Sequence, residues 1–587
     1  MLKILKYLKS TEWFLIGISL IFIVTQVWLD LKLPDYMAEI TRLVKTTGSA
    51  MSDIWLTGGY MILCALGSLV AAIVVGYFAS RIGASFSQRI RSLLFNKVES
   101  FSMEEINRFS TSSLITRSTN DITQVQMLIV IALQIVIKAP IMAVWAVTKI
   151  SGKGFEWSVA TGVAVLVILV LVAILMVFVI PKFKKMQILT DDVTRVTREN
   201  LTGLRVVRAY NAEDYQKTKF EAANKALTDT QMFTNRAMAL LMPTLMAMLN
   251  GLSLAIYWIG AYLINAAQMM DKLTVFTDMV VFSNYAMQVI MAFMLMVIIF
   301  IMLPRASVSA QRINEVLDTE PSIVDGKETA GKPDLKGVVT FNNVSFKYPD
   351  AAGYVLENVC FTAKQGETVA FIGSTGSGKS TLVNLIPRFF DVTGGEVLVD
   401  GVNVKDYKLE ALYNKIGYVP QKAVLFTGTV ASNVAYGDNG GDNFTVDEVK
   451  QAVQIAQGAD FVEKMENGYE ASISQGGTNV SGGQKQRLAI ARAICRKPEI
   501  YIFDDSFSAL DYKTDRILRC KLKQETAGVT SIIVAQRIGT IMDADQIIVL
   551  DEGKIVGKGT HKELLRNCAV YTEIAMSQLS EEELKDE

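Results

Sequence analysis

The chain has few of the residues that build metal and disulfide sites. Its 587 residues include five cysteines and one histidine. The cysteines are scattered, odd in number and contain no C-x-x-C pair, so neither a disulfide framework nor a zinc site is expected. We expect them to be small buried hydrophobic residues in a reducing compartment. Basic and acidic residues balance at 58 each, and this absence of net charge gives no reason to expect nucleic acid as a partner.

Apolar residues are abundant instead. Hydrophobic residues make up 51% of the chain and charged residues only 20%, which is more apolar than a soluble protein of this size needs. Several stretches are long enough to cross about 30 Å of hydrocarbon. They lie near residues 13–33, 55–79, 125–150, 157–180, 236–265 and 277–303. These spans exclude a soluble protein, and no cleavable signal pattern precedes the first of them.

The charges between the spans predict an orientation. The segments 81–121 and 181–236 are long and rich in arginine and lysine, whereas the connections near 151–156 and 266–274 are short. The positive-inside rule places the first two segments in the cytoplasm and the short connections outside. An even number of spans then leaves both termini in the cytoplasm. The sequence therefore predicts a multi-pass protein of the cell membrane.

Two features of the apolar half have more than one explanation. Lys138 falls inside the third span, where a charge costs at least about 2.5 kcal/mol unless it faces water or a partner. Either it faces a cavity, or it lies nearer the membrane surface than expected and extends toward water. Methionines gather in the last two spans, where flexible thioethers would suit a surface for varied apolar ligands; ordinary helix packing or lipid contact explains them equally. They are Met238, Met242, Met246, Met248, Met287, Met291, Met294, Met296 and Met302.

A phosphate-binding motif follows the apolar half. Residues 373–380 read GSTGSGKS and match the P-loop pattern G-x-x-x-x-G-K-[ST]. The apolar run ETVAFIG precedes the motif and a helical pattern follows from Thr381, which is the strand–loop–helix context that a P-loop requires. Its glycines let backbone N–H groups surround phosphate oxygens. Lys379 adds a charge for the β- and γ-phosphates, and Ser380 offers its hydroxyl to Mg²⁺.

A second anion-binding motif lies further along the chain. Residues 481–484 read SGGQ and open the helical run KQRLAIARAI, so their N–H groups and the helix dipole suit an anion. An apolar strand that ends in Asp504 comes next. Together, the P-loop, SGGQ and this strand resemble the nucleotide-binding domain of ABC transporters. The apolar half resembles the exporter-type membrane domain of the same family, so the resemblance covers the whole chain.

The resemblance implies a multidomain membrane protein. A six-helix all-α transmembrane domain with long cytoplasmic helical extensions would span 1–318, and a linker would span 319–337. An α/β P-loop ATPase domain would occupy 338–575, and an acidic tail 576–587. In this family short coupling helices at the tips of the cytoplasmic loops touch the nucleotide domains, and the matching stretches are near 103–108 and 210–214.

The resemblance also implies roles for single residues. Tyr348 would stack on adenine, Gln421 would reach Mg²⁺ and the attacking water from a mobile loop, and Asp504 would hold Mg²⁺ through water. SGGQ would contact the γ-phosphate of ATP bound to a partner subunit, so that each site is built across a dimer. The residues expected to bind ATP are Tyr348, Gly373, Ser374, Thr375, Gly376, Ser377, Gly378, Lys379, Ser380 and Thr381. Ser481, Gly482, Gly483 and Gln484 would serve the partner's ATP, and Ser380, Gln421 and Asp504 the metal.

Two positions depart from the family pattern. The family places a glutamate after the Mg²⁺ aspartate as general base, whereas this chain has Asp505, which is shorter by about 1.5 Å. Misplacing a catalytic group by about 1 Å can cost on the order of 10²-fold in rate. The family also places a histidine after the next strand, against the γ-phosphate. Here that position holds Gln536, which can donate a hydrogen bond but cannot become cationic. The single histidine, His561, lies beyond the last strand and is expected to be structural.

With these two departures and an intact SGGQ, the chain resembles the degenerate-site subunit of bacterial heterodimeric multidrug exporters. The chain is expected to pair with a second ABC half-transporter, to bind ATP and Mg²⁺, and to export hydrophobic or amphipathic small molecules across the lipid bilayer. Its own ATP site would hydrolyse slowly, while its SGGQ would complete the partner's active site. A lipid, peptide or siderophore carrier is an alternative with the same fold. An ATP-gated channel or regulator is an alternative of a different class.

Overall fold

The computed structural model describes residues 3–46, 49–151, 154–268, 271–349, 351–438, 444–525 and 527–579. The chain divides into two compact units, one made of Met1–Glu99 with Thr111–Thr319 and the other of Ser100–Ser110 with Glu320–Glu587. The short segment after the second long helix therefore belongs to the unit that contains the ATPase domain. The expected acidic tail begins at the end of the last described helix, and its residues from 580 onward lie outside the described ranges.

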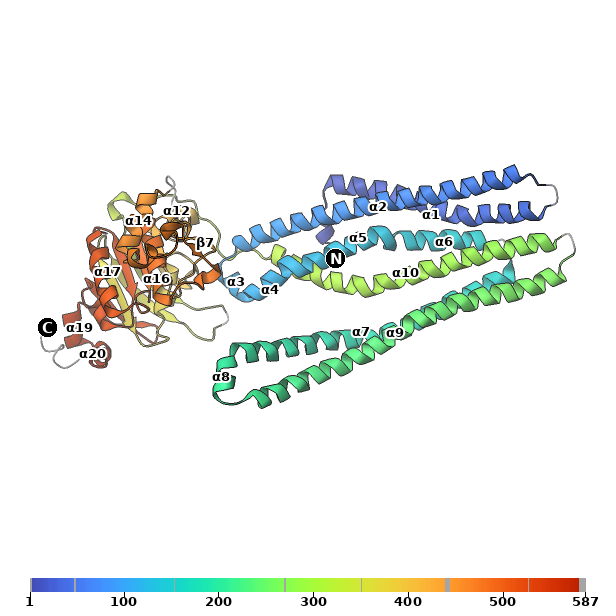
Figure 1. Cartoon of the computed structure of the whole chain (residues 1–587). Coiled ribbons are helices and arrows are strands. Elements are labelled where there is room, and N and C mark those ends of the chain that lie inside the picture. The colour runs from blue at the N-terminus through green and yellow to red at the C-terminus, as the bar shows by residue number, and fades with distance from the viewer. Residues whose placement is uncertain are drawn as a thin grey trace. The chain divides into compact units, whose positions relative to one another are not determined.

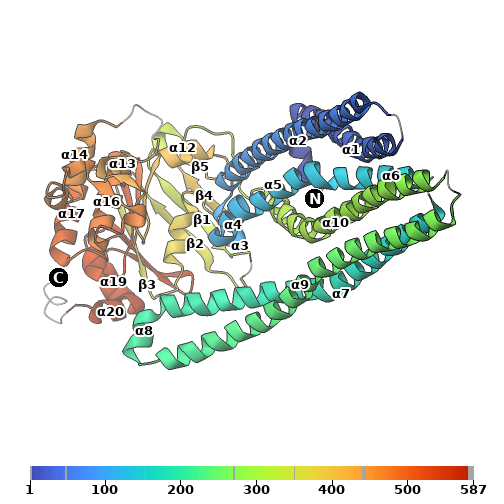
Figure 2. The same ribbon diagram turned by 45° about the vertical axis from the view of Figure 1, so that its right-hand side comes forward.

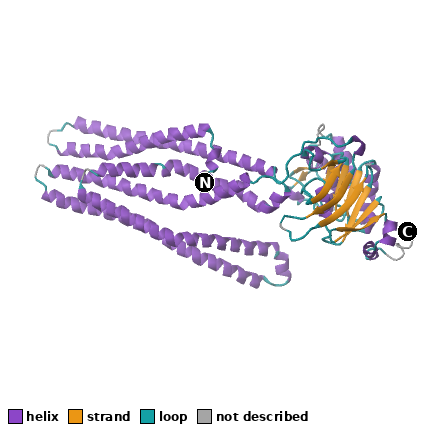
Figure 3. Cartoon of the chain, turned by 180° about the vertical axis from the view of Figure 1, so that it is seen from behind, coloured by secondary structure: helices purple, strands orange, loops and turns teal. Residues whose placement is uncertain are grey.

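The first unit consists of long helices that run side by side along most of their length (Figures 1 and 3). Within the described residues, six helical segments are long and apolar enough to cross a membrane, which confirms the predicted fold class. Their bounds extend well beyond the predicted apolar stretches. The long helices are α1 (Ser10–Lys45), α2 (Met51–Glu99), α7 (Phe155–Thr202), α9 (Glu213–Ala266) and α10 (Lys272–Asp318).

The third crossing is built from several pieces rather than from one regular helix. It comprises α4 (Thr111–Thr116), the π-helical turn η2 (Arg117–Asp121), α5 (Ile122–Ile131), a second π-helical turn η3 (Ala132–Val136) and α6 (Lys138–Ile150). A π turn inserts an extra residue into the helical repeat and changes which side chains share a face. Polar side chains of this crossing contact neighbouring helices at two places, at η2 and just after η3.

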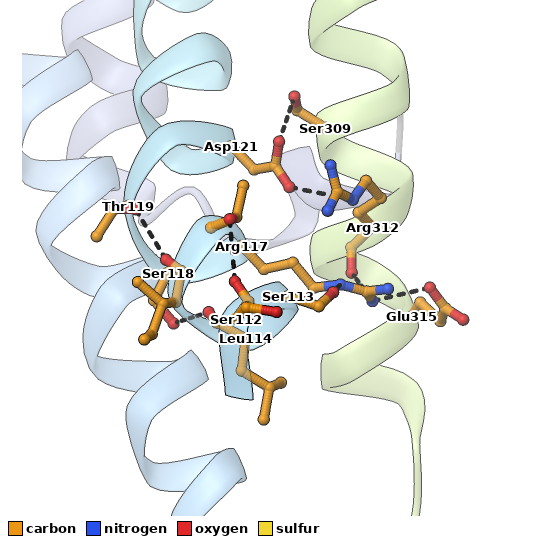
Figure 4. Close-up of polar contacts among 12 residues, drawn as sticks. Ser112, Ser113, Leu114, Arg117, Ser118, Thr119, Asp121, Ser309, Arg312 and Glu315 are labelled. Carbon is orange, nitrogen blue, oxygen red and sulfur yellow. Dashed lines mark hydrogen bonds and ion pairs between the residues drawn. The ribbon is translucent and has the colours of Figure 1, made fainter. Parts of the chain in front are cut away.

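At η2, polar side chains join the third crossing to α10 (Figure 4). Arg117 donates from Nη1 to the carbonyl oxygen of Arg312 at 2.9 Å and to Glu315 Oε2 at 2.8 Å. Ser309 donates to Asp121 Oδ1 at 2.9 Å, and Arg312 Nε lies 3.4 Å from Asp121 Oδ2. Arg117 and Asp121 are both buried. Each of these buried charges therefore has an opposite charge or a hydrogen-bond partner on α10.

Lys138 is paired inside the helical unit. Its Nζ lies 3.1 Å from Asp30 Oδ2 on α1, and the Ser68 hydroxyl on α2 also donates to the Asp30 carboxylate. Gln288 on α10 donates to the Asp30 carbonyl oxygen at 3.3 Å. The lysine thus has a carboxylate partner at its own depth, so its charge requires neither an open cavity nor extension to the membrane surface.

The methionines of the last spans divide between packing and exposure. Met238, Met248, Met294 and Met296 pack against the buried core of the helical unit. Met242, Met246, Met287 and Met291 are exposed. Helix packing therefore accounts for the first group, and the second remains available for contact with lipid, with a partner or with cargo.

The two predicted coupling stretches differ in the structure. The first coincides with helix α3 (Met103–Phe109). Ser102 caps this helix: its hydroxyl accepts from the N–H of Glu104, and its own N–H donates to the Glu105 carboxylate. The prediction for 210–214 is wrong, because the short helix there, α8 (Leu204–Ala209), ends before it. The cause is local: Asn211 adopts a φ of 51°, a left-handed conformation that asparagine tolerates and that ends a helix.

The second unit contains the sheets (Figures 2 and 3). A six-stranded sheet has the order β12-β11-β3-β10-β9-β6. Pairing is parallel from β11 to β6, and only the edge strand β12 is antiparallel. These strands are β3 (Thr368–Gly373), β6 (Ile416–Val419), β9 (Ile500–Asp504), β10 (Thr530–Val534), β11 (Gln546–Asp551) and β12 (Lys554–Gly559). A four-stranded antiparallel sheet, β2-β1-β4-β5, consists of β1 (Val339–Phe346), β2 (Leu356–Ala363), β4 (Gly394–Val399) and β5 (Val402–Asn403).

The central strand β3 is buried on both faces. Ala370 and Ile372 pack into one apolar cluster, and Val369 and Phe371 pack into another. Successive side chains of a strand point to opposite faces, so an unbroken apolar run is typical of a parallel strand covered on both sides. This burial fixes the strand whose carboxyl end carries the P-loop.

All five cysteines lie in the described ranges and are free thiols. Cys495 and Cys568 are buried, as expected, and Cys64 is half-buried. Cys360 and Cys520 are exposed, so the prediction of burial is wrong for these two. Both occupy the solvent side of an amphipathic element, β2 and the helix α17 (Tyr512–Glu525) respectively.

Candidate nucleotide site

Strand order brings the predicted site residues to one edge of the six-stranded sheet. The P-loop follows β3, Gln536 follows β10, Asp504 ends β9, and Gln421 follows β6. These four strands are neighbours and parallel. Their carboxyl ends therefore meet at the edge where open α/β sheets bind ligands.

The P-loop encloses its own lysine. Lys379 Nζ donates to the carbonyl oxygens of Gly373 at 2.8 Å and Ser374 at 2.7 Å, and to Ser377 Oγ at 3.2 Å. A Cβ at Gly373 would lie 2.0 Å from the carbonyl oxygen of Leu550, so only glycine fits there. Burial lowers the pKa of Lys379, and the carboxylates of Asp505 and Asp504 oppose that shift. The loop thus holds a cation ready for phosphate oxygens.

Two of the predicted metal-site groups are in direct contact. Ser380 Oγ, in the first turn of α11 (Lys379–Leu385), donates to Asp504 Oδ1 at 2.8 Å. Burial raises the pKa of the Asp504 carboxyl, while the hydrogen bond from Ser380 opposes the shift. A divalent cation beside this carboxylate would favour its charged form. Hydroxyl and carboxylate oxygens are donors that Mg²⁺ accepts alongside nucleotide phosphates, so these residues fit the ion.

The described residues contain no cluster of three or more His, Cys, Asp or Glu side chains that could hold a metal. Magnesium commonly binds through one or two carboxylates, waters and the phosphates of its substrate. The pair formed by Ser380 and Asp504 matches this pattern, in which the nucleotide supplies the remaining oxygens.

Asp505 is held by two side-chain amides. Gln421 Nε2 donates to its Oδ2 at 3.1 Å, and Gln536 Nε2 donates to the same oxygen at 2.7 Å. The carboxylate is buried, and the backbone of Asp505 has a φ of 46°, in the left-handed region that aspartate tolerates better than most residues. An attacking water could bond to this oxygen only by displacing an amide.

Tyr348 lies beside the P-loop helix. Its hydroxyl is 3.0 Å from Thr381 Oγ1, and its ring meets Phe346 and Phe390 edge to face at centroid distances of 4.8 and 5.3 Å. The ring is half-buried. The structure therefore places this aromatic residue next to the phosphate loop, where the resemblance predicts adenine.

The SGGQ segment forms the start of α16 (Gly482–Cys495). The Ser481 hydroxyl accepts from the N–H of Gln484 at 3.3 Å, and the Gln484 side chain accepts from the N–H of Ser481 at 2.8 Å. A Cβ on Gly482 would meet nothing within 4 Å, whereas one on Gly483 would lie 3.3 Å from the carbonyl oxygen of Ala509. Reciprocal capping thus leaves an open N-terminal turn with glycines at its tip.

His561 begins α19 (His561–Asn567). This helix follows the edge strand β12 in the sequence, not one of the four strands that carry the site residues. Its Nδ1 is 2.6 Å from the Tyr571 hydroxyl in α20 (Ala569–Met576), and both side chains are buried. This contact joins the last two helices and agrees with a structural role.

Sequence and structure comparisons define the family. Residues 16–293 match the family described as "ABC transporter transmembrane region", and residues 356–508 match "ABC transporter". An ABC transporter ATP-binding protein of Mycobacterium tuberculosis is 39% identical over 94% of this chain and 93% of its own length. The ABC transporter ATP-binding protein YfiB of Bacillus subtilis is 36% identical over 99% of both.

Two further similarities concern a named activity and the fold. A protein named "ATP-dependent lipid A-core flippase", from Pseudomonas fluorescens, is 33% identical over 78% of this chain and 75% of its own length. The structure of a bacterial Atm1-family ABC exporter with ATP bound superposes with a TM-score of 0.81 at 24% identity, covering 97% of this chain and 99% of that one. This chain belongs to the ABC transporter family. It combines the transmembrane region and the ATP-binding domain of an exporter in one polypeptide, and is a multi-pass membrane protein with an ATP-hydrolysing domain.

Proposed function

We propose that the chain is one half of a heterodimeric exporter whose two ATP sites are unequal. Its own P-loop, closed by the segment of the partner that corresponds to SGGQ, binds ATP and turns it over slowly. Its SGGQ closes the partner's P-loop, where most hydrolysis takes place. Hydrophobic or amphipathic small molecules are the cargo.

The environment of Asp505 carries this proposal. The general base must reach a water in line with the γ-phosphate, and Asp505 is shorter than glutamate by one methylene, about 1.5 Å. Its Oδ2 already accepts N–H groups from Gln421 and Gln536. Since the carboxylate is shorter than that of glutamate and one of its oxygens already accepts two amide N–H groups, slow chemistry is the expected result.

The phosphate-binding groups favour retained ATP binding at the same site. Lys379 lies among three acceptors of its own loop, and Ser380 contacts Asp504. In the proposed site Ser380, Gln421 and Asp504 would hold Mg²⁺, the last through water, and the ion would supply positive charge to the phosphates. Gln536 would donate its amide to the terminal phosphate.

The intact SGGQ supports a partner with a complete site. Its two glycines leave room at the helix tip for a phosphate from another subunit. We place the protein in the cell membrane with both termini in the cytoplasm. The segments 81–121 and 181–236 are rich in arginine and lysine, and such segments lie on the cytoplasmic side.

A lipid carrier is the second candidate. Its support is the 33% identity to a protein named for flipping lipid A core and the exposed methionines of the last spans, which suit acyl chains as well as drugs.

The decisive experiment compares the chain alone with the chain co-expressed with a half-transporter that has the catalytic glutamate and histidine. Purified into lipid vesicles, the chain alone should hydrolyse ATP near the background of its Lys379→Ala variant, and the pair should be active. Replacement of the partner's catalytic glutamate by glutamine should silence the pair. Robust, cooperative hydrolysis by the chain alone would contradict the proposal of unequal sites.

A further inference from the structure

The C-terminal segment reaches the loop that carries Gln536. Gln578 follows α20 and lies near the end of the described chain. Its Nε2 donates to the carbonyl oxygen of Gln536 at 2.8 Å, and its Oε1 accepts from the N–H of Ile538 at 2.8 Å. A side-chain amide offers a donor and an acceptor in one plane. These two bonds therefore require Nε2 to face the Gln536 carbonyl and Oε1 to face the N–H of Ile538.

Both partners of Gln578 are groups that the nucleotide loop itself leaves unsatisfied. Ile538 begins the short helix α18 (Ile538–Ile541). The side chain of its cap residue, Arg537, makes no hydrogen bond to the first N–H groups of this helix. The first N–H groups of a helix need outside acceptors, and Gln578 provides one. The carbonyl oxygen of Gln536 receives the other bond.

The helix before Gln578 is firmly held. Tyr571 and Ala575 are fully buried in the same apolar cluster as Ile538 and Ile541. The hydroxyl of Tyr571 contacts His561 at 2.6 Å. The single histidine of the chain thus anchors α20, and α20 holds Gln578 against the loop.

Gln536 is consequently fixed at both ends. Its side chain donates to Asp505 Oδ2 at 2.7 Å, while its backbone carbonyl is bound by Gln578. Rotation of the peptide that follows Gln536 would break the bond from Gln578, and such a rotation would also redirect the loop. Arg537, next in the loop, donates to the carbonyl oxygen of Ser508 at 3.4 Å.

We infer that Gln578 is a positioning residue for Gln536, through which the C-terminal segment sets recognition of the terminal phosphate of ATP. The inference rests on the proposed function, in which Gln536 faces the γ-phosphate. Because ADP lacks that phosphate, Gln578 should matter for ATP and not for ADP.

The test uses the full-length purified chain in lipid nanodiscs with Mg²⁺, where ATP and ADP each displace a trinitrophenyl derivative of ATP. Gln578→Ala should weaken ATP binding about fivefold, which corresponds to the loss of one hydrogen bond. ADP binding should change less than about twofold. Met576→Ala, which removes an exposed side chain at the end of α20, should change neither.

Two further variants separate positioning from mere support of the fold. Gln578→Glu keeps an acceptor for the N–H of Ile538 and suits the start of α18, but it cannot donate to the carbonyl of Gln536. Because its second carboxylate oxygen would repel that carbonyl, it should lose ATP affinity at least as strongly as Gln578→Ala, while ADP binding changes less than about twofold. In a Gln536→Ala background, Gln578→Ala should have no additional effect on ATP, since the side chain that it positions is gone.

The outcomes distinguish this inference from the proposed function. If Gln536→Ala weakens ATP binding but Gln578→Ala does not, or if the two losses multiply, the inference is wrong and the proposed site stands. Equal losses for ATP and ADP would show that Gln578 only supports the fold. A wild-type chain that binds ATP no better than Lys379→Ala would overturn the proposed site and the inference with it.

Discussion

At Asp505 two separate constraints act on one carboxylate. The side chain is one methylene shorter than glutamate, and its Oδ2 is shared by the amides of Gln421 and Gln536. The backbone φ of 46° adds a third feature, because few side chains other than asparagine and aspartate adopt that region at low cost. Restoring the length of the side chain alone would leave the amide of Gln536 bound to it.

The first prediction concerns the pair Asp505 and Gln536. Asp505→Glu with Gln536→His should raise ATP turnover of the purified chain by about 10- to 100-fold. In a dimer of two identical chains the SGGQ of one copy closes the P-loop of the other copy, so no second kind of subunit is needed. The gain should exceed the product of the two single gains, because base and phosphate contact act on one transition state.

Its measurement is phosphate release by the wild type, the two single variants and the double variant in lipid vesicles. Lys379→Ala added to the double variant supplies the background. Turnover that stays at that background in the double variant would mean that the main defect lies elsewhere in the site.

The second prediction concerns the division of labour between the P-loop and SGGQ. In the heterodimer Gly483→Asp should reduce steady-state hydrolysis far more than Lys379→Ala, because Gly483 serves the partner's active site and Lys379 serves the slow one. The new carboxylate would repel the partner's γ-phosphate, and its Cβ would also lie 3.3 Å from the carbonyl of Ala509.

A matched control for that comparison is Gly353→Ala. Its Cβ would meet nothing within 4 Å, and it lies outside both motifs, so hydrolysis should not change. ATPase assays of the three heterodimers decide the matter. Equal losses for Gly483→Asp and Lys379→Ala, or the reverse order, would contradict the assignment of the two sites.

Motifs predicted the location of the nucleotide site because phosphate recognition relies on contiguous backbone. The P-loop and SGGQ are each one short continuous segment, so their residues are adjacent in sequence. The shared oxygen of Asp505 was not predictable in this way. Gln421 and Gln536 meet there only because β6, β9 and β10 are neighbours. Gln578 follows the C-terminal helices, and no sequence pattern near it predicts its contact with Gln536. The functional roles of these residues remain predictions.

At the scale of elements, the third crossing departs most from its sequence pattern. An apolar run predicts that a segment crosses, but apolarity does not report the number of residues per turn. The π turns η2 and η3 therefore have no signature in hydropathy. At η2, Arg117 and Asp121 both face α10, and burial of these charges makes the contact costly to disturb.

The third prediction follows from that contact. Arg117→Ala removes hydrogen bonds to the Arg312 carbonyl and the Glu315 carboxylate. It should destabilise the helical unit by about 2 kcal/mol, since Glu315 is half-exposed and recovers part of its hydration. We expect the unfolding temperature in detergent to fall by about 5 °C.

The comparison variant is Arg195→Ala. Arg195 also pairs with a carboxylate, Asp192 at 2.6 Å, but its side chain is 62% exposed, so its loss should leave the unfolding temperature unchanged. Equal effects of the two substitutions would show that the η2 network adds nothing beyond a surface ion pair.

At the scale of the whole molecule, chain order and compact units do not coincide. The prediction of a membrane half followed by an ATPase half holds for the fold class, and comparison with ABC transporters confirms it. The segment Ser100–Ser110 nevertheless belongs to the second unit. Within that unit the side chain of Glu105 in α3 accepts a hydrogen bond from the N–H of Ser322 at 2.9 Å. The hydroxyls of Ser102 and Ser322 are hydrogen-bonded to each other at 2.8 Å. Hydropathy could not predict this, because it places a residue inside or outside the membrane and says nothing of which fold it joins.

The final prediction concerns vectorial transport by the assembled protein. Inside-out vesicles that contain the chain and its partner should accumulate an amphipathic fluorescent dye when ATP is added outside. Replacing the partner's catalytic glutamate by glutamine should abolish accumulation. Asp505→Asn in this chain should leave most of it, because the slow site contributes little turnover and ATP binding by Lys379 and its loop is untouched.

The same vesicles discriminate among the competing functions. A channel would dissipate a dye gradient imposed beforehand and could not create one, since it does not couple hydrolysis to direction. A lipid carrier would leave the dye in place and instead move a fluorescent phospholipid between leaflets with the same dependence on the partner's glutamate. Accumulation that survives loss of the partner's glutamate but fails with Asp505→Asn would reverse the assignment, because Asp505 would then be the base on which transport depends.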